Sequence, residues 1–207
     1  MKKYVVHAAI LAIFTAGMTA SVGIVTTSTA AACTAESTRS DQLASSLPQV
    51  NYTDRGRHVL ALQLALRAQG YDLQGTGNYL TATRVAVKDF QRGHGIQASG
   101  IVGSKTWHAL VGPLPPGVTG NGRITPPTFG INPGERGEDK LNYLWNTLSR
   151  IHPYAEKMVD EGGYGPKTQK LVKDFQRRAN IKASGIIGPK TWAAMYEVVA
   201  VSGRWGC

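Results

Sequence analysis

The chain has 207 residues, of which 23 are lysine or arginine and 13 are aspartate or glutamate, so its formal net charge is +10. This surplus attracts polyanions, but the sequence has no run of basic residues and no known nucleic-acid motif, so we expect no nucleic acid as a partner. No His-x-His or His-Glu-x-x-His spacing indicates zinc, and we also expect no metal and no cofactor.

Residues 1–32 have the layout of a secretory signal peptide. Lys2 and Lys3 precede an apolar run at residues 8–14, and alanines at residues 30–32 form an A-x-A cleavage site. A membrane anchor would need about 20 consecutive apolar residues, whereas hydroxyl side chains such as Thr15 interrupt this run. We therefore expect a secreted protein without stable membrane insertion. Removal of the signal takes away Lys2 and Lys3, so the net charge of the mature protein is lower by two.

The chain has two cysteines, Cys33 and Cys207, and cleavage before Cys33 would leave one at each end of the mature protein. In an oxidising exterior the simplest outcome is one disulfide that joins the two ends. The alternative is a lipoprotein with the lipid on Cys33. Ala30 then stands where such a signal ordinarily has leucine, so we rank lipidation second.

Two segments have the composition of linkers. Residues 33–55 are rich in serine, threonine and alanine, and residues 113–135 hold most of the prolines of the chain among glycines. Neither segment has enough apolar side chains to fold by itself. We expect the proline-rich segment to be a semi-extended spacer between two tethered domains, residues 56–112 and 136–201, followed by a tail at 202–207.

Both domains contain the same folding unit, because residues 83–110 are repeated at residues 168–195 with about 17 of 28 positions identical. Apolar side chains recur at helical spacing in three places in each unit. The spacing predicts three short helices per domain, and hence an all-α protein of two small three-helix domains joined by a Pro/Gly-rich linker. Stripes that include Phe90, Trp107, Phe175 and Trp192 are expected to form the cores.

The turns between these helices carry a second repeated motif. Residues 162–168 read GGYGPKT and residues 185–191 read GIIGPKT, each directly before a helix. Glycine permits positive φ, and proline in the first helical turn gives up an N–H that has no partner. Gln91 and Gln176 follow a core phenylalanine, and we expect them to hold backbone amides of a turn rather than a ligand.

The order L-x-x-L-Q-x-x-L, G-x-Y-x-x-x-T-x-x-x-V-x-x-F-Q and G-I-V-G-x-K-T-W-x-x-L resembles the short three-helix peptidoglycan-binding domain of bacterial cell-wall hydrolases and phage endolysins. Two such domains, residues 58–111 and 138–199, cover more than half of the mature chain. The family usually has aspartate before the glycine of both turns. Those positions here are Thr76, Ser99, Glu161 and Ser184.

Candidate ligand contacts lie at the rim of the first turn of each domain. A tyrosine offers a flat face and one hydroxyl, and an arginine can pair with a stem-peptide carboxylate through two hydrogen bonds. The alternative is an ordinary packed or solvated surface. The candidates are Tyr79, Thr83 and Arg84 in domain 1 and Tyr164, Thr168 and Gln169 in domain 2.

The resemblance implies a protein of the cell wall that binds peptidoglycan through two tethered modules, by glycan or stem peptide. The signal layout adds the expectation of secretion, the basic surplus an attraction to anionic wall polymers, and the missing catalytic motifs a non-catalytic role. No G-x-S-x-G motif indicates a hydrolase, and no region outside the two units is long enough for a catalytic domain. Two alternatives stay open. One is an interaction module for another secreted protein such as a wall hydrolase, and the other is a wall-lytic enzyme with an unrecognised active site.

Overall fold

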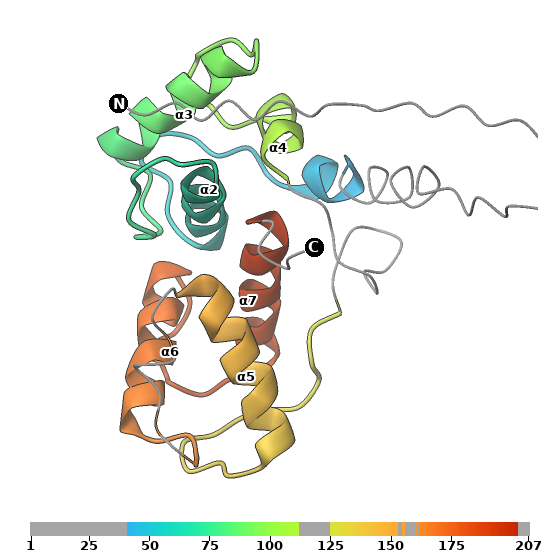
Figure 1. Cartoon of the computed structure of the whole chain (residues 1–207), viewed down its shortest axis with the longest axis vertical. Helices are drawn as coiled ribbons and strands as arrows, with labels where there is room; N and C mark the ends of the chain where they lie inside the picture. The colour runs from blue at the N-terminus through green and yellow to red at the C-terminus, as the bar shows by residue number, and fades with distance from the viewer. Residues whose placement is uncertain (1–40, 112–124, 153–154, 156–159, 161, 203–207) are drawn as a thin grey trace, which may run out of the picture.

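The computed structural model describes residues 41–111, 125–152, 155, 160 and 162–202 (Figure 1). The predicted signal peptide, Cys33 with Cys207, and residues 113–124 of the predicted linker lie outside the described residues. Within the described part, the regular secondary structure is helical, and extended segments meet only in isolated bridges. No helix of this part is long and apolar enough to cross a membrane.

Two three-helix domains follow each other along the chain. Domain 1 contains α2 (Arg57–Ala68), α3 (Thr81–Gly93) and α4 (Ser104–Leu110), and domain 2 contains α5 (Glu138–Ile151), α6 (Pro166–Arg178) and α7 (Pro189–Val201). This arrangement confirms the predicted all-α fold class with two small three-helix domains.

The sequence explains where the helices begin and which faces they bury. α6 and α7 each have proline in the first turn, after a glycine with extended backbone, where the missing N–H costs no hydrogen bond. The inward faces carry the predicted apolar stripes, and Trp107 and Trp192 are among the largest fully buried side chains. The assignment of both tryptophans to the core is therefore confirmed.

Each domain also includes a segment of extended chain before its first helix, which we call its strap. The strap of domain 1 contains Pro48 and Val50, and that of domain 2 contains Phe129 and Ile131. In domain 1, Val50 forms a bridge with Val102, and Trp107 Nε1 donates a hydrogen bond of 2.8 Å to Pro48 O. In domain 2, Ile131 bridges Ile187 in the same way, and Trp192 Nε1 donates to Phe129 O at 2.9 Å. The tryptophan of each domain thus packs in the core and also binds the strap through its indole N–H.

These straps differ from the linkers that the composition predicted. Residues 41–46 are helical, and Leu43, Ala44 and Val50 of this segment are buried against domain 1. Segment 33–55 is thus not wholly outside domain 1, and residues 125–135 belong with domain 2. Composition misled here because a few apolar side chains, too few to make a core, are enough to join a core that already exists.

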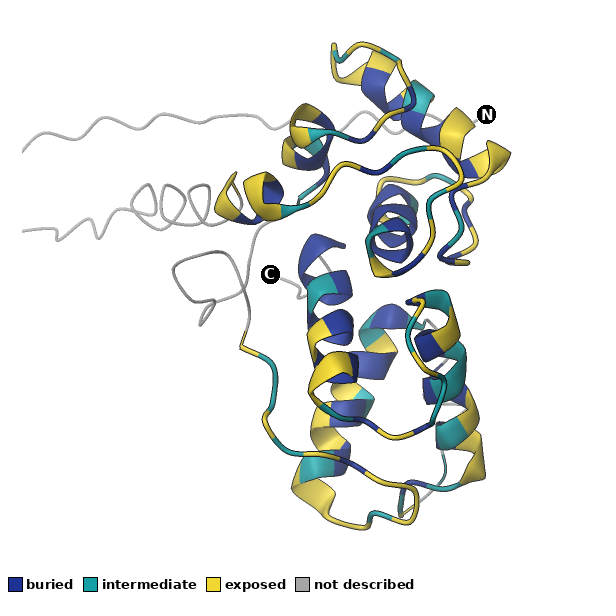
Figure 2. Cartoon of the chain, turned by 180° about the vertical axis from the view of Figure 1, so that it is seen from behind, coloured by how far each residue is buried: buried dark blue, intermediate teal, exposed yellow. Residues whose placement is uncertain are grey.

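The two domains contact each other through α2 and α7, and α7 also packs on α5 (Figure 1). Every residue of α2 from Val59 to Leu66 is buried, and the helix is coloured as buried along most of its length (Figure 2). Burial along so many positions requires neighbours on several sides of a helix. α2 has them in both domains: α3 and α4 of domain 1 and α7 of domain 2.

Polar contacts complete this interface. Arg57 Nε lies 2.8 Å from Glu197 Oε2, and Arg178 Nη1 donates to Gly75 O at 3.1 Å. The expectation of two domains that are tethered without being fused is therefore corrected. Leu60 of α2 lines a small cavity together with residues of domain 2.

Candidate functional site

Three buried glutamines hold the turns in place through hydrogen bonds to the turn backbone. Gln91 Oε1 accepts from Gly100 N at 3.0 Å, while its Nε2 donates to Ile101 O at 2.8 Å. Gln176 makes the matching contacts in domain 2, with Gly185 N at 2.8 Å and Ile186 O at 2.8 Å. The predicted role of these two glutamines is confirmed. Because the anchors are equivalent, the second turn has the same backbone in both domains.

Gln63 plays the same part for the first turn of domain 1 and was not singled out from the sequence. Its Oε1 accepts from Gly77 N at 2.8 Å, and its Nε2 donates to Asn78 O at 3.0 Å. Domain 2 has Trp145 at the position after Leu144 that corresponds to Gln63 after Leu62. Only the glutamine in the L-x-x-L-Q motif could have indicated this anchor.

Tyr79 and Tyr164 are buried, not exposed at a rim. The Tyr79 hydroxyl donates to Gly100 O at 2.6 Å, and the Tyr164 hydroxyl donates to Gly185 O. Burial raises the pKa of Tyr79 to about 12 and raises the pKa of Tyr164 as well. The tyrosines tie the first turn to the second, so the expectation that their faces are open to a ligand is corrected. A buried phenol fits here because its one donor finds a carbonyl.

Thr83 and Thr168 are also buried. Thr83 Oγ1 accepts from Gln63 Nε2 at 2.9 Å. In domain 2, Thr168 N and Oγ1 donate to Asp160 Oδ2 at 2.8 and 3.0 Å, and the hydrogen bond from the Thr168 backbone is the main cause that lowers the pKa of Asp160. Both threonines hold turns, so the expectation that they contact a ligand is corrected too.

Arg84 and Gln169 are the two candidates that reach the surface. Both lie over the glycine of the second turn: a Cβ on Gly100 would stand 3.1 Å from Arg84 Cγ, and one on Gly185 would stand 2.6 Å from Gln169 Cγ. Glycine is favoured at both positions because φ is +78° and +75°, and a Cβ would also crowd the side chain above it, more tightly at Gly185 than at Gly100.

One helical turn further along, a lysine lies against the same glycine. Lys88 Cε stands 3.1 Å from the Cβ position of Gly100, and Lys173 Cε stands 2.9 Å from that of Gly185. An isoleucine after each glycine is exposed. We call each group of four a turn surface. Turn surface 1 is Arg84, Lys88, Gly100 and Ile101, and turn surface 2 is Gln169, Lys173, Gly185 and Ile186.

Tyr52 extends turn surface 1, a position that the sequence pattern does not predict. The Arg84 guanidinium carbon lies 5.3 Å from the centre of its ring, and 43% of the residue is exposed. The neighbouring Thr53 has a φ of 77°, which is unusual for a β-branched residue. Tyr52 lies in the segment that composition assigned to a linker, so no periodic signal could have placed it beside α3.

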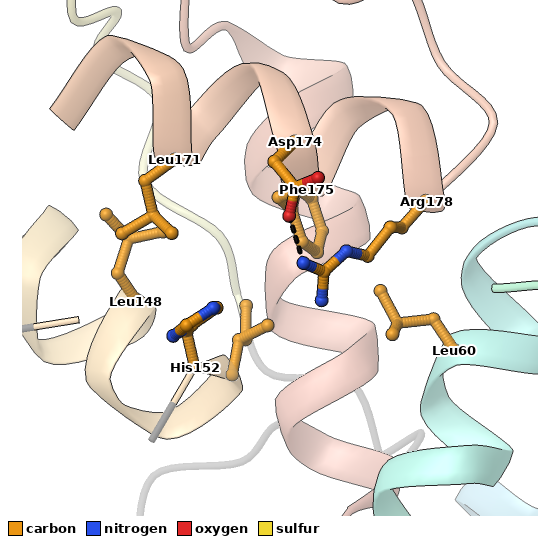
Figure 3. A pocket seen from close by; sticks show the side chains of 8 residues that line it. Leu60, Leu148, His152, Leu171, Asp174, Phe175 and Arg178 are labelled. Atoms are coloured by element: carbon orange, nitrogen blue, oxygen red, sulfur yellow. Dashed lines mark ion pairs between the residues drawn. The ribbon is translucent and has the colours of Figure 1, made fainter. Parts of the chain in front are cut away.

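A small cavity lies between the domains and has a volume of about 10 Å³, at the lower limit for one water molecule. Figure 3 shows Asp174 and Arg178 of α6 paired beside it, with Leu60 of α2 on the other side. His152 lines the same space, and its Nδ1 is buried with no hydrogen-bond partner among the described residues. Room for one water does not admit a sugar or a peptide, so we assign this cavity to the domain interface.

Acid should weaken the fold through His152. Burial lowers the pKa of its imidazole below the ordinary 6.5, and the Arg178 guanidinium lowers it further, while Asp174 acts in the opposite direction. The neutral imidazole therefore contributes stability that is present above pH 6.5 and is lost as the pH falls through the pKa of the folded protein. We expect the Tm to fall between about pH 7.5 and 5.5, and His152→Asn to reduce that fall.

The carboxylates with lowered pKa values, Glu135, Asp160 and Glu197, titrate below this window, since their ordinary values are 4.5, 3.8 and 4.5. Thermal unfolding at the two pH values tests the expectation. An unchanged fall in the His152→Asn variant would remove His152 as its source.

The described residues contain no group of three or more His, Cys, Asp or Glu side chains placed to hold a metal ion.

Comparison with known proteins places both domains in one family. The family model described as "Putative peptidoglycan binding domain" matches residues 55–110 and 139–195. A "Probable N-acetylmuramoyl-L-alanine amidase" of Bacillus licheniformis is 33% identical over 155 residues, which are 70% of this chain and 43% of the amidase. The N-acetylmuramoyl-L-alanine amidase CwlL of the same organism is 34% identical over 155 residues, 68% of this chain and 43% of that protein. The chain thus spans less than half the length of these relatives.

Proposed function

The chain belongs to the peptidoglycan-binding domain family, which it matches twice, and from this premise we propose that it is a secreted protein that binds bacterial peptidoglycan without catalysis. The observation that carries the proposal is the pair of turn surfaces. Each of the two matched domains presents one, built on the same glutamine, tyrosine and glycine framework. Secretion is supported by the signal-peptide layout of residues 1–32, and the disulfide between Cys33 and Cys207 stays a prediction.

The domain interface gives the two surfaces a defined relation to each other. Engagement of one surface makes the second contact intramolecular, and a fixed geometry limits which wall segments can occupy both. The basic surplus adds a second, less selective attraction to anionic wall polymers. Specific contact and charge attraction can be separated, because salt screens the latter: the Debye length falls to about 3 Å at 1 M ionic strength.

Co-sedimentation with insoluble peptidoglycan, stripped of acidic polymers, tests this function. We expect the protein to sediment at low salt and part of that binding to persist at about 1 M salt. The double variant Arg84→Ala with Gln169→Ala should lose most of the persistent part, because one contact is removed from each turn surface. Helicity should be unchanged, since neither side chain is buried.

The matched control is Arg92→Ala with Arg177→Ala. Both arginines are exposed and lie near the ends of α3 and α6, and each pairs with an aspartate three residues before it on the same helix. This control should bind peptidoglycan at high salt like the parent. Binding that disappears with salt in the parent would leave a basic surface without a recognition site.

A wall-lytic enzyme is the second candidate, favoured by the two relatives named as N-acetylmuramoyl-L-alanine amidases. Zymography on purified walls separates the two candidates. Cleared substrate would support lysis, whereas binding without clearing supports a binding protein.

A further inference from the structure

Tyr52, Arg84 and Lys88 stand together at the end of domain 1 that carries turn surface 1. Arg84 and Lys88 are four residues apart on α3 and lie against the same glycine. Neither takes part in an ion pair within the described part of the chain, whereas Arg92 on the same helix lies 3.5 Å from Asp89. Like charges at this spacing repel slightly. An anion bound between them would remove that cost.

Tyr52 holds Arg84 in place. The guanidinium carbon is 5.3 Å from the centre of the Tyr52 ring, which is within the range of a cation–π contact. The Tyr52 ring also makes an edge-to-face contact with the buried Tyr79, with 6.4 Å between the ring centres. This contact holds the Tyr52 ring in position. Arg84 is thus oriented before any ligand arrives, and its planar donors remain available for two parallel hydrogen bonds.

The backbone beside Tyr52 is strained. Thr53 has a φ of 77°, and the equivalent position in domain 2 is Gly134 with a φ of 91°. The equivalence follows from the strap, because Thr53 N donates to Tyr79 O and Gly134 N donates to Tyr164 O, both at 2.9 Å. Residues held in such a conformation gather at ligand sites. Domain 1 therefore accepts a strain that domain 2 avoids with glycine.

The same register shows what domain 2 lacks. Pro133 precedes Gly134 where Tyr52 precedes Thr53, and Gln169 lies over Gly185 where Arg84 lies over Gly100. Turn surface 2 keeps an amide and one ammonium group. It has no aromatic ring and no guanidinium at the equivalent positions, so the two surfaces differ in the charge of the group that they can bind.

We propose that Tyr52, Arg84 and Lys88 form a carboxylate subsite in domain 1, which takes a free carboxylate of a peptidoglycan stem peptide, while turn surface 2 does not select for the charged form. This proposal rests on the proposed function. Arg84 binds the carboxylate through two charge-assisted hydrogen bonds, and Lys88 adds a second cation. Exposed Ile101 and the Tyr52 ring contact the apolar parts of the same peptide.

A pair of soluble muropeptides tests the subsite: a disaccharide–pentapeptide with free carboxylates, and the same compound with those carboxylates converted to amides. Calorimetric titration of the full mature protein should show that the free acid binds about tenfold more tightly than the amide, as expected for hydrogen bonds to a charged group. Arg84→Gln should abolish most of this preference. It introduces the side chain that domain 2 already carries at this position, so the fold tolerates it.

Gln169→Arg is the reciprocal variant and should raise affinity for the free acid at domain 2. Tyr52→Ala should weaken binding of the free acid by releasing Arg84, and the Lys88→Ala variant should lower the preference in part. Arg92→Ala is the control, since its partner is Asp89, and it should keep the full preference. Amide chemical shifts of Gly100 and Ile101 report whether the ligand sits at turn surface 1.

Equal affinity of the parent protein for acid and amide, or a preference that survives Arg84→Gln, would overturn the subsite. If the parent still sediments with stripped peptidoglycan at high salt, the failure concerns the subsite alone. If the parent binds neither muropeptide nor insoluble peptidoglycan, the proposed function fails together with the subsite.

Discussion

Replacement of Trp192 by alanine is expected to unfold domain 2 rather than to weaken binding alone. The side chain is fully buried, donates to Phe129 O at 2.9 Å, and meets the rings of Phe129 and Tyr196 edge-on at 5.8 and 6.0 Å. Truncation of a buried tryptophan costs about 3–5 kcal/mol, and whole domains have only about 5–15 kcal/mol of stability. The variant also releases the strap of domain 2.

Denaturant unfolding followed by circular dichroism measures this loss. Trp192→Phe is the matched variant, because it keeps an aromatic ring in the core and removes the hydrogen bond to the strap, so its loss should be clearly smaller. Since α7 also packs on α2, domain 1 should lose stability with domain 2. A Trp192→Ala protein that melts like the parent but no longer binds peptidoglycan would make Trp192 a ligand contact instead of a core residue.

Gly77→Ala is expected to open the domain interface. Gly77 has a φ of +71°, and a Cβ at this position would lie 2.1 Å from the carbonyl oxygen of Arg178 in domain 2. A backbone carbonyl at the end of α6 cannot rotate away as a flexible side chain can, so one domain must shift. Overpacking of this kind costs about 1–3 kcal/mol, in addition to the cost of a left-handed conformation for alanine.

The control for this variant is Gly70→Ala. Gly70 also has a positive φ, +95°, but a Cβ there would meet no atom within 4 Å. Both variants place alanine at a positive φ, and only Gly77→Ala adds the clash, so we expect Gly77→Ala to lose more free energy of unfolding than Gly70→Ala. Small-angle scattering should show a larger radius of gyration for Gly77→Ala only. Equal losses and unchanged dimensions in both variants would mean that the interface does not restrain the domains.

Several elements of this protein could be predicted from local sequence. The repeat at residues 83–110 and 168–195 indicated two domains, and the helical spacing of apolar residues indicated three helices in each. Trp107 and Trp192 were assigned to the core because they lie on these stripes, and Gln91 and Gln176 were assigned to the turns because an amide can satisfy both a donor and an acceptor. Each of these predictions depends on residues that are close in sequence.

The site residues could not be placed from local sequence. Tyr79 and Tyr164 lie in turns, which have no periodicity to separate an inward from an outward direction, and both proved to be buried. Arg84 and Gln169 lie on helices, and their places beside Gly100 and Gly185 result from the turn that folds back over the helix. Tyr52 reaches Arg84 only because the strap bridges Val102 through Val50.

Local sequence is enough to predict the helices, the turns with their glycines, and the core positions of each unit. Which surfaces remain open, and how the two units meet, depends on tertiary contacts between residues that are far apart in the chain. The apolar residues of α2 indicate that this helix is buried, but not whether its partner is its own domain, a second copy or domain 2. Hydrophobic burial is non-directional. The partner of α2 is selected instead by shape and by specific contacts, such as the carbonyl of Arg178 against Gly77 and the ion pair of Arg57 with Glu197.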